Sequence, residues 1–105
     1  MNDTKWAEIF MAFYYGIECS SNSELSNLQI AWTTRSLSGY LYSDTTWSHF
    51  GCSMEFSKEI DWLRIQLTPE NKQVVLGILR SIHVPGEVFE DSVYVYGYRT
   101  DVGYV

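Results

Sequence analysis

The stretch IDWLRIQLTPENKQVVLGILRSI, residues 60–82, decides the fold because its hydrophobic period changes part-way along it. Over residues 60–67 the side chains alternate with a period of two, which predicts a β-strand. One face of this strand carries Leu63, Ile65 and Leu67, and the other carries Trp62, Arg64 and Gln66.

A helix is expected directly after this strand. Thr68 followed by Pro69 is typical of a helix start, so we predict a helix from Pro69 to about Ile82. Its buried face consists of Val74, Val75, Ile78, Leu79 and Ile82. Gly77 costs about 1 kcal/mol relative to alanine inside a helix, so we expect it to let another element approach closely. His83 follows the helix C-terminus, where the helix dipole favours an imidazolium, which predicts a capping role.

Residues 4–15 predict the first helix. Its apolar side chains recur at the spacing of one helical face: Trp6, Ile9, Phe10, Phe13, Tyr14 and Ile17. Asp3 is expected as the N-cap of this helix, and Gly16 as the residue of positive φ that ends it.

The rest of the chain indicates shorter elements. Residues 18–26 are polar and predict a loop, and residues 43–53 have no clean period, so they are a loop or an irregular edge strand. Further strands are expected over residues 28–34, 40–42 and 93–99. In the last strand Val93 and Val95 share one face, and Tyr94, Tyr96 and Tyr98 share the other.

The resulting order is helix, several strands, helix and strand. This order favours one α+β domain over residues 1–105, with a mainly antiparallel sheet and both helices packed on one of its faces.

Composition excludes several classes of protein. The 105 residues include 13 acidic and 7 basic side chains, a net charge of −6, without a basic stripe, so we expect no nucleic-acid binding. No apolar run is long enough to cross a membrane. The first residues lack a signal-peptide pattern, so we expect a cytoplasmic chain in which Cys19 and Cys52 remain thiols.

The candidate ligands for a metal site are Cys19, His49, Cys52 and His83. His49 and Cys52 have the spacing of a ligand pair, whereas zinc sites normally supply two such pairs. Cys19 and His83 each lack a near partner in the sequence. We therefore expect no metal and no cofactor.

The two histidines are the candidates for acid–base or nucleophilic catalysis. His49 lies beside Ser48 and near Cys52, and His83 lies near Ser81, but no nucleophile elbow or glycine-rich phosphate loop surrounds them. A non-catalytic binding protein is therefore favoured. Two alternatives stay open: a small hydrolase that uses His49 or His83, and a domain that binds a small ligand in an aromatic pocket.

A surface of tyrosines among carboxylates is the strongest candidate site. Aromatic side chains anchor protein interfaces, and carboxylates around them attract a basic partner. The alternative is that a second layer of structure covers the tyrosines. The predicted partner-binding residues are Glu87, Glu90, Asp91, Tyr96, Tyr98 and Asp101.

The chain resembles the immunity proteins of bacterial polymorphic toxin systems, above all those of contact-dependent growth inhibition. The similarity lies in its length, acidity and aromatic content, in KWAEIF at residues 5–10, in residues 32–47 and in EIDWLRI at residues 59–65. The resemblance implies a protein that binds and blocks the C-terminal toxin domain of a neighbouring gene product, often a nuclease with a basic cleft. It assigns no role to single residues, and it is compatible with a monomer or a homodimer.

Overall fold

Antiparallel strands form one sheet in the computed structural model, which describes residues 1–52, 57–99 and 101–105 and leaves out the side chain of Cys52. Within these residues the strand order is β2-β1-β3-β5-β4. The strands are β1 (Trp32–Ser36), β2 (Leu41–Asp44), β3 (Ile60–Gln66), β4 (Gly86–Val88) and β5 (Ser92–Tyr96). The expected antiparallel sheet is therefore confirmed.

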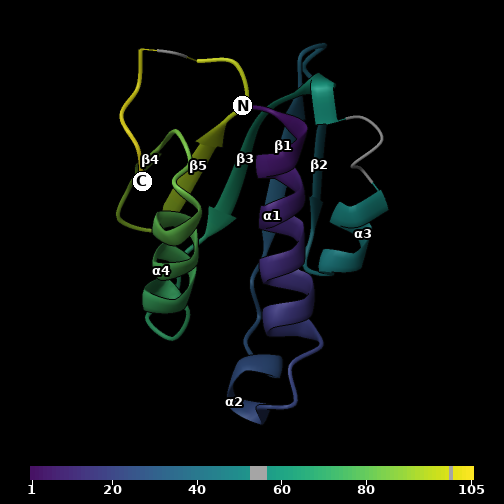
Figure 1. Ribbon diagram of the computed structural model, residues 1–105, viewed down its shortest axis with the longest axis vertical. Helices are drawn as coiled ribbons and strands as arrows, with labels where there is room; N and C mark the ends of the chain where they lie inside the picture. The colour runs from purple at the N-terminus through teal and green to yellow at the C-terminus, as the bar shows by residue number, and fades with distance from the viewer. Residues whose placement is uncertain (53–56, 100) are drawn as a thin grey trace.

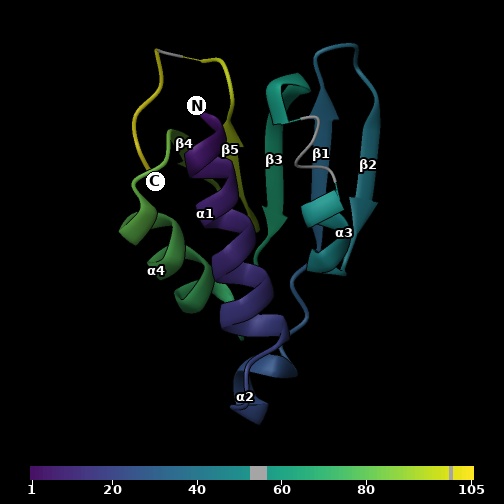
Figure 2. The same cartoon turned by 45° about the vertical axis from the view of Figure 1, so that its right-hand side comes forward.

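The longer helices lie together on one side of this sheet (Figures 1 and 2). The helices are α1 (Asp3–Phe13), which continues into the π-helical turn η1 (Tyr14–Glu18), α2 (Ser23–Ser26), α3 (Trp47–Cys52) and α4 (Lys72–Ile82). The one-turn α2 projects from one end of the molecule, whereas α1, α3 and α4 cover the same sheet face. This arrangement confirms the α+β class. None of the described helices is both long and apolar enough to cross a membrane.

The core lies between the helices and the sheet. The predicted inward faces of the first helix and of the two main strands are confirmed, because Trp6, Ile9, Phe13, Leu63, Ile65, Val93 and Val95 are all buried. Aromatic rings fill the space near α3. The ring of Trp47 stacks on that of Phe13 with centroids 4.4 Å apart, and Trp32 lies 5.8 Å from Trp47.

Both predicted ends of the first helix need correction. Asn2, not Asp3, is the N-cap, since its extended backbone lets the side chain accept the Lys5 amide at 2.9 Å. Gly16 does not end the helix with a positive φ, because it lies inside η1. There the Cys19 amide donates to the Tyr14 carbonyl at 2.8 Å, and the widened turn keeps Ile17 buried.

The second long helix starts later than predicted. The Thr68 amide donates to the Asn71 side-chain oxygen at 2.8 Å, and the Asn71 amide donates to the Thr68 hydroxyl at 3.2 Å. These two bonds form a turn that precedes the first residue of α4, Lys72. His83 is the C-cap, as predicted, with a left-handed φ of 66°. The expected close approach at Gly77 is wrong, since a Cβ there would meet nothing within 4 Å.

Several elements were missed or misplaced. Residues 43–53 contain α3, whose buried Trp47 and Phe50 are too few to give a helical period in the sequence. The predicted loop over residues 18–26 contains α2, and β4, which begins at Gly86 three residues after His83, was not predicted. The strand expected over residues 28–34 begins only at Trp32.

Candidate functional site

The sheet face opposite the helices collects the outward-pointing side chains of four strands. Arg64 of β3 lies opposite Thr33 of β1 and Tyr94 of β5, and Glu87 of β4 lies on the far side of Tyr94. We call this surface the outer face: Thr33, Arg35, Trp62, Arg64, Glu87, Phe89, Tyr94 and Tyr96. None of the described helices packs on it (Figure 2).

An aromatic group occupies the middle of the outer face. The Tyr94 ring meets Trp62 and Phe89 edge to face, with centroids 5.1 and 5.5 Å away. It also stacks loosely on Tyr96, at 6.3 Å. Phe89 is 46% exposed, and Trp62 and Tyr94 are half-buried. The group therefore presents apolar ring surface to solvent on a rigid sheet.

Arg64 is held in place among these rings. Its guanidinium makes long hydrogen bonds of 3.4 Å to the Thr33 hydroxyl and 3.5 Å to the Tyr94 hydroxyl. It also lies 5.8 Å from the centre of the Trp62 ring, within the range of a cation–π contact. The outer face therefore carries the positive charge of Arg64, and the N–H groups of its guanidinium point along the sheet.

The second cation near the outer face is paired. Arg35 donates to the Asp61 carboxylate at 2.7 Å, and the two side chains are 41% and 19% exposed. The charges of Arg35 and Asp61 are opposite, so the pair adds no net charge to the outer face.

Tyr96 differs from the exposed anchor that its position in the sequence suggests. Only 5% of it is exposed, because the Arg99 guanidinium lies 4.5 Å above its ring and Tyr94 flanks it. Burial raises the pKa of the Tyr96 hydroxyl, and the charge of Glu87 raises it further. The Tyr96 hydroxyl therefore loses its proton less readily than that of an ordinary tyrosine.

The predicted acidic residues divide between two ends of the sheet. Glu87, Glu90 and Asp91 are exposed along β4 and in the turn that precedes β5. Asp101 is exposed beyond the other end of β5, a strand of five residues that spans about 16 Å at about 3.3 Å per residue. Tyr98 is 52% exposed beyond that same end, and its hydroxyl donates to the Lys58 carbonyl.

The three residues of the central aromatic group were not predicted as site residues: Trp62, Phe89 and Tyr94. The strand pattern had already placed Trp62 and Tyr94 on outward faces, so the signal was present. The pattern could not show that β3 and β5 are neighbours, which requires the strand order.

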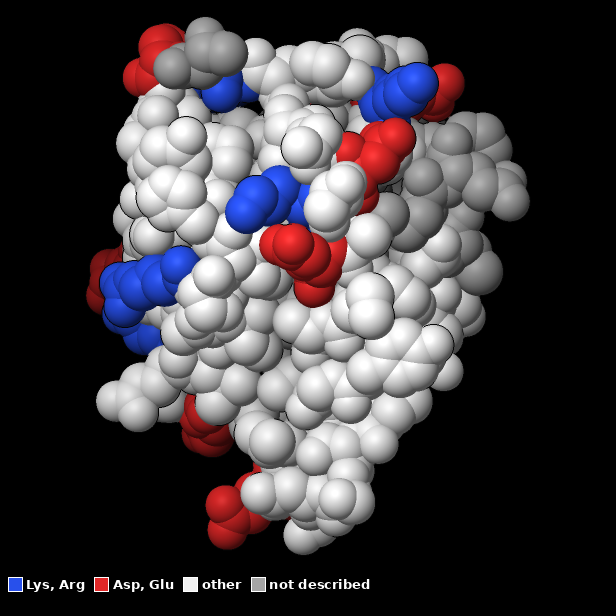
Figure 3. All heavy atoms as spheres, viewed as in Figure 1, with Lys and Arg blue, Asp and Glu red and all other residues white. Residues whose placement is uncertain are grey.

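The helix side of the molecule has a different character (Figure 3). On this face the described acidic and basic side chains form small separate groups between wide uncharged areas. The described acidic side chains on this side do not form one continuous acidic surface.

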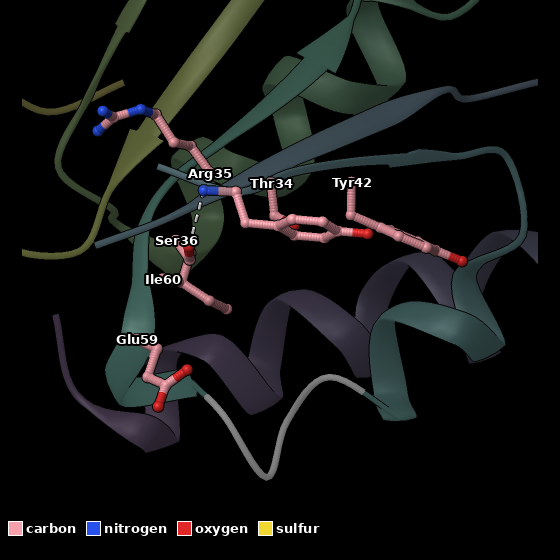
Figure 4. A pocket seen from close by; sticks show the side chains of 7 residues that line it. Thr34, Arg35, Ser36, Tyr42, Glu59 and Ile60 are labelled. Carbon is pink, nitrogen blue, oxygen red and sulfur yellow. Dashed lines mark hydrogen bonds between the residues drawn. The ribbon is translucent and has the colours of Figure 1, made fainter. Parts of the chain in front are cut away.

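A small pocket opens beside the β1–β2 hairpin (Figure 4). It has a volume of about 250 Å³ and is lined by Thr34, Arg35, Ser36, Tyr40, Tyr42, Glu59 and Ile60. The Arg35 side chain points away from the other labelled residues. Pockets for drug-sized ligands usually measure about 300–1,000 Å³, so this one suits only a small molecule.

His49, which only the alternative hydrolase hypothesis would use, forms a pair with Asp44. The His49 Nδ1 atom lies 2.5 Å from an Asp44 oxygen that also accepts the Tyr42 hydroxyl at 2.8 Å. The other oxygen accepts the amides of Thr45 and Thr46, at 2.7 and 2.9 Å. These partners, His49 first, hold the pKa of Asp44 well below its usual range. The carboxylate thereby ties β2 to the start of α3.

The other residues considered for chemistry lie apart. His83 stacks on Tyr104 with ring centroids 4.0 Å apart, and Cys19 is an exposed thiol. Among the described side chains, no three His, Cys, Asp or Glu residues are grouped closely enough to hold a metal ion. The side chain of Cys52 is outside the described part of the chain.

Comparisons of this chain with protein-family models, with curated proteins and with solved structures found no match.

Proposed function

We propose that this protein is a non-catalytic inhibitor of the immunity type, which binds a basic toxin domain, such as a nuclease, through its outer face. The main support is the half-exposed aromatic group of Trp62, Phe89 and Tyr94 on a sheet face where no described helix packs. Rigid aromatic side chains are the commonest energetic centres of protein interfaces.

The size of the surface is adequate for such a complex. A standard protein interface covers about 800 Å² on each partner. The accessible surface of this chain is 6080 Å², so the interface would occupy about an eighth of it. This area matches one face of a small sheet with its rim.

Charge supports a basic partner. The chain carries a net charge of −6, and Glu87, Glu90 and Asp91 border the aromatic group on the β4 side. Lysine and arginine side chains of a toxin would pair with these carboxylates, which would occupy positions that substrate phosphates otherwise take. Such complementarity mainly accelerates association, and it weakens with salt.

The test uses the C-terminal domain of the protein encoded immediately upstream. We expect co-expression to restore growth, and we expect tight binding that weakens at high salt. The double variant E90K/D91K should lower affinity at least tenfold at low salt. E24K, a single charge reversal in α2, which projects away from the sheet (Figure 1), is the control and should change affinity less than twofold. Equal effects of the two variants would refute this placement of the interface, and absence of binding and of toxicity would refute the proposed function.

A second candidate function is supported by the pocket of Figure 4. Tyr40, Tyr42 and Glu59 all line this pocket, which suits a small organic cation because ring faces and a carboxylate both attract positive charge. A thermal-shift series with small amines tests it. A shift that Y40A abolishes would support the ligand-binding role, and a series without any shift would exclude it. The small volume of the pocket is the reason that this role ranks second.

A further inference from the structure

A second pocket brings together basic groups from three separate parts of the chain. It has a volume of about 380 Å³ and lies between the start of α1, the end of α4 and the C-terminal tail. Lys5 comes from α1, His83 is the C-cap of α4, and Arg99 follows β5. Asn2 and Tyr104 also line it, and none of its described lining residues is acidic.

The backbone holds these groups in position. The tail returns along the start of β4, where the Val105 amide donates to the Val84 carbonyl at 3.1 Å and the Gly86 amide to the Gly103 carbonyl at 3.0 Å. This return places the Tyr104 ring flat against His83, 4.0 Å away. Arg99 is supported from below by the Tyr96 ring, 4.5 Å from its guanidinium carbon.

The charge of this pocket is opposite to that of the whole chain. The sequence has only 7 lysines and arginines against 13 acids, yet two of these cations and a histidine line one pocket. Lys5 is partly compensated, since its ammonium donates to the Ile82 carbonyl and lies 3.8 Å from Glu8. Arg99 has the Tyr96 ring beneath it, and an aromatic face does not neutralise a full charge.

We infer that this pocket binds a small phosphate-bearing molecule. Arginine offers paired donors that match the oxygens of a phosphate group, and lysine adds a second charge for a dianion. The amide of Asn2 and the hydroxyl of Tyr104 supply neutral hydrogen-bond donors at the same pocket. The volume exceeds that of one phosphate group, which leaves room for a small organic part. This inference does not depend on the proposed toxin partner, although Arg99 also lies over Tyr96 at the edge of the outer face.

Inorganic phosphate is the probe for this site. We expect a titration followed by two-dimensional NMR to give saturable shifts of the amides of Lys5, His83 and Arg99, with a Kd of about 1 mM or lower. Sodium chloride at the same ionic strength should give no saturable shift. Acetate at the same ionic strength should bind at least fivefold more weakly, and equal binding of acetate would overturn the assignment to phosphate.

Variants locate the binding groups. K5Q and R99Q should each weaken phosphate binding at least fivefold, and K5R should restore most of it by restoring the charge. K72Q removes an exposed lysine at the opposite end of α4 and is the control, expected to bind like the wild type. Shifts that do not saturate, or equal losses in K72Q and R99Q, would overturn the proposal. Unchanged spectra away from the pocket show that the variants remain folded.

Discussion

The ring of Trp62 meets the ring of Tyr94 edge to face, with centroids 5.1 Å apart and planes inclined by 65°. In the strand register Trp62 lies directly opposite Tyr96, so its ring contacts a diagonal neighbour instead. Arg99 lies over the Tyr96 ring, and Tyr94 stands between Trp62 and Phe89. The diagonal contact therefore joins β3, β5 and the end of β4 into one aromatic surface.

A substitution on this aromatic surface should weaken partner binding and leave the free energy of unfolding nearly unchanged. Phe89 is 46% exposed, so F89S should change the free energy of unfolding by less than about 1 kcal/mol, the range typical of surface sites. The same variant should weaken binding of the proposed toxin partner at least tenfold, as the loss of an aromatic anchor does. Urea denaturation and a binding titration measure the two effects.

The control for F89S is Y15S. Tyr15 is 60% exposed and lies in η1, away from the sheet. We expect it to leave affinity unchanged. A large loss of stability in F89S would contradict this assignment, because it would place Phe89 in the core.

Two glycines should respond to alanine in opposite directions. G77A should raise the free energy of unfolding by about 0.5–1 kcal/mol, because Gly77 is an exposed helical residue and the added Cβ meets nothing within 4 Å. G86A should lower it by more than about 2 kcal/mol, because its Cβ would lie 2.1 Å from the Tyr94 carbonyl oxygen. Thermal unfolding of both variants decides the matter, and a loss of stability in G77A would be the contrary result.

The free energy of unfolding should depend on pH in the acidic range because of Asp44. Its hydrogen bonds hold its pKa below the usual value of 3.8, so the unfolded chain takes up this proton more readily than the folded one. Stability from this group is therefore complete above the usual pKa and is lost as the pH falls below it. D44N should lower stability at neutral pH by about 1 kcal/mol and should lose less on acidification than the wild type.

Urea unfolding at a series of pH values from neutral to about 2 tests this expectation. H49Q, which removes the first of the Asp44 partners, should give an intermediate slope. Parallel curves for D44N and the wild type would show that Asp44 does not cause the acid dependence.

Two core tryptophans should differ in their tolerance of phenylalanine. The Trp47 indole N–H donates to the Ile30 carbonyl at 3.1 Å, whereas that of Trp32 is buried without a hydrogen-bond partner among the described residues. Both changes to phenylalanine remove similar volume, but only W47F leaves a buried acceptor unpaired. W47F should therefore be less stable than W32F by about 1 kcal/mol or more. Urea denaturation of both would show equal losses if the Trp47 bond contributed nothing.

Several features were predictable from local pattern. The period-two alternation over residues 60–67 predicted β3 and both of its faces, and the helical spacing from Trp6 to Ile17 predicted the inward side of α1. These patterns are readable because burial on one side selects apolar residues at the period of the element. The helix within residues 43–53 could not be predicted, because α3 is short and only Trp47 and Phe50 mark its buried side.

The sequence by itself determined the fold class, the two long helices, the main strands and the acidic excess, because each depends on neighbours along the chain or on composition. Only the tertiary structure decided that Trp62 meets Tyr94, since this contact requires β5 to pair with β3 across a helix and a further strand. The same holds for the pocket of Lys5, His83 and Arg99. The three residues come from separate parts of the chain, and only packing brings their side chains together.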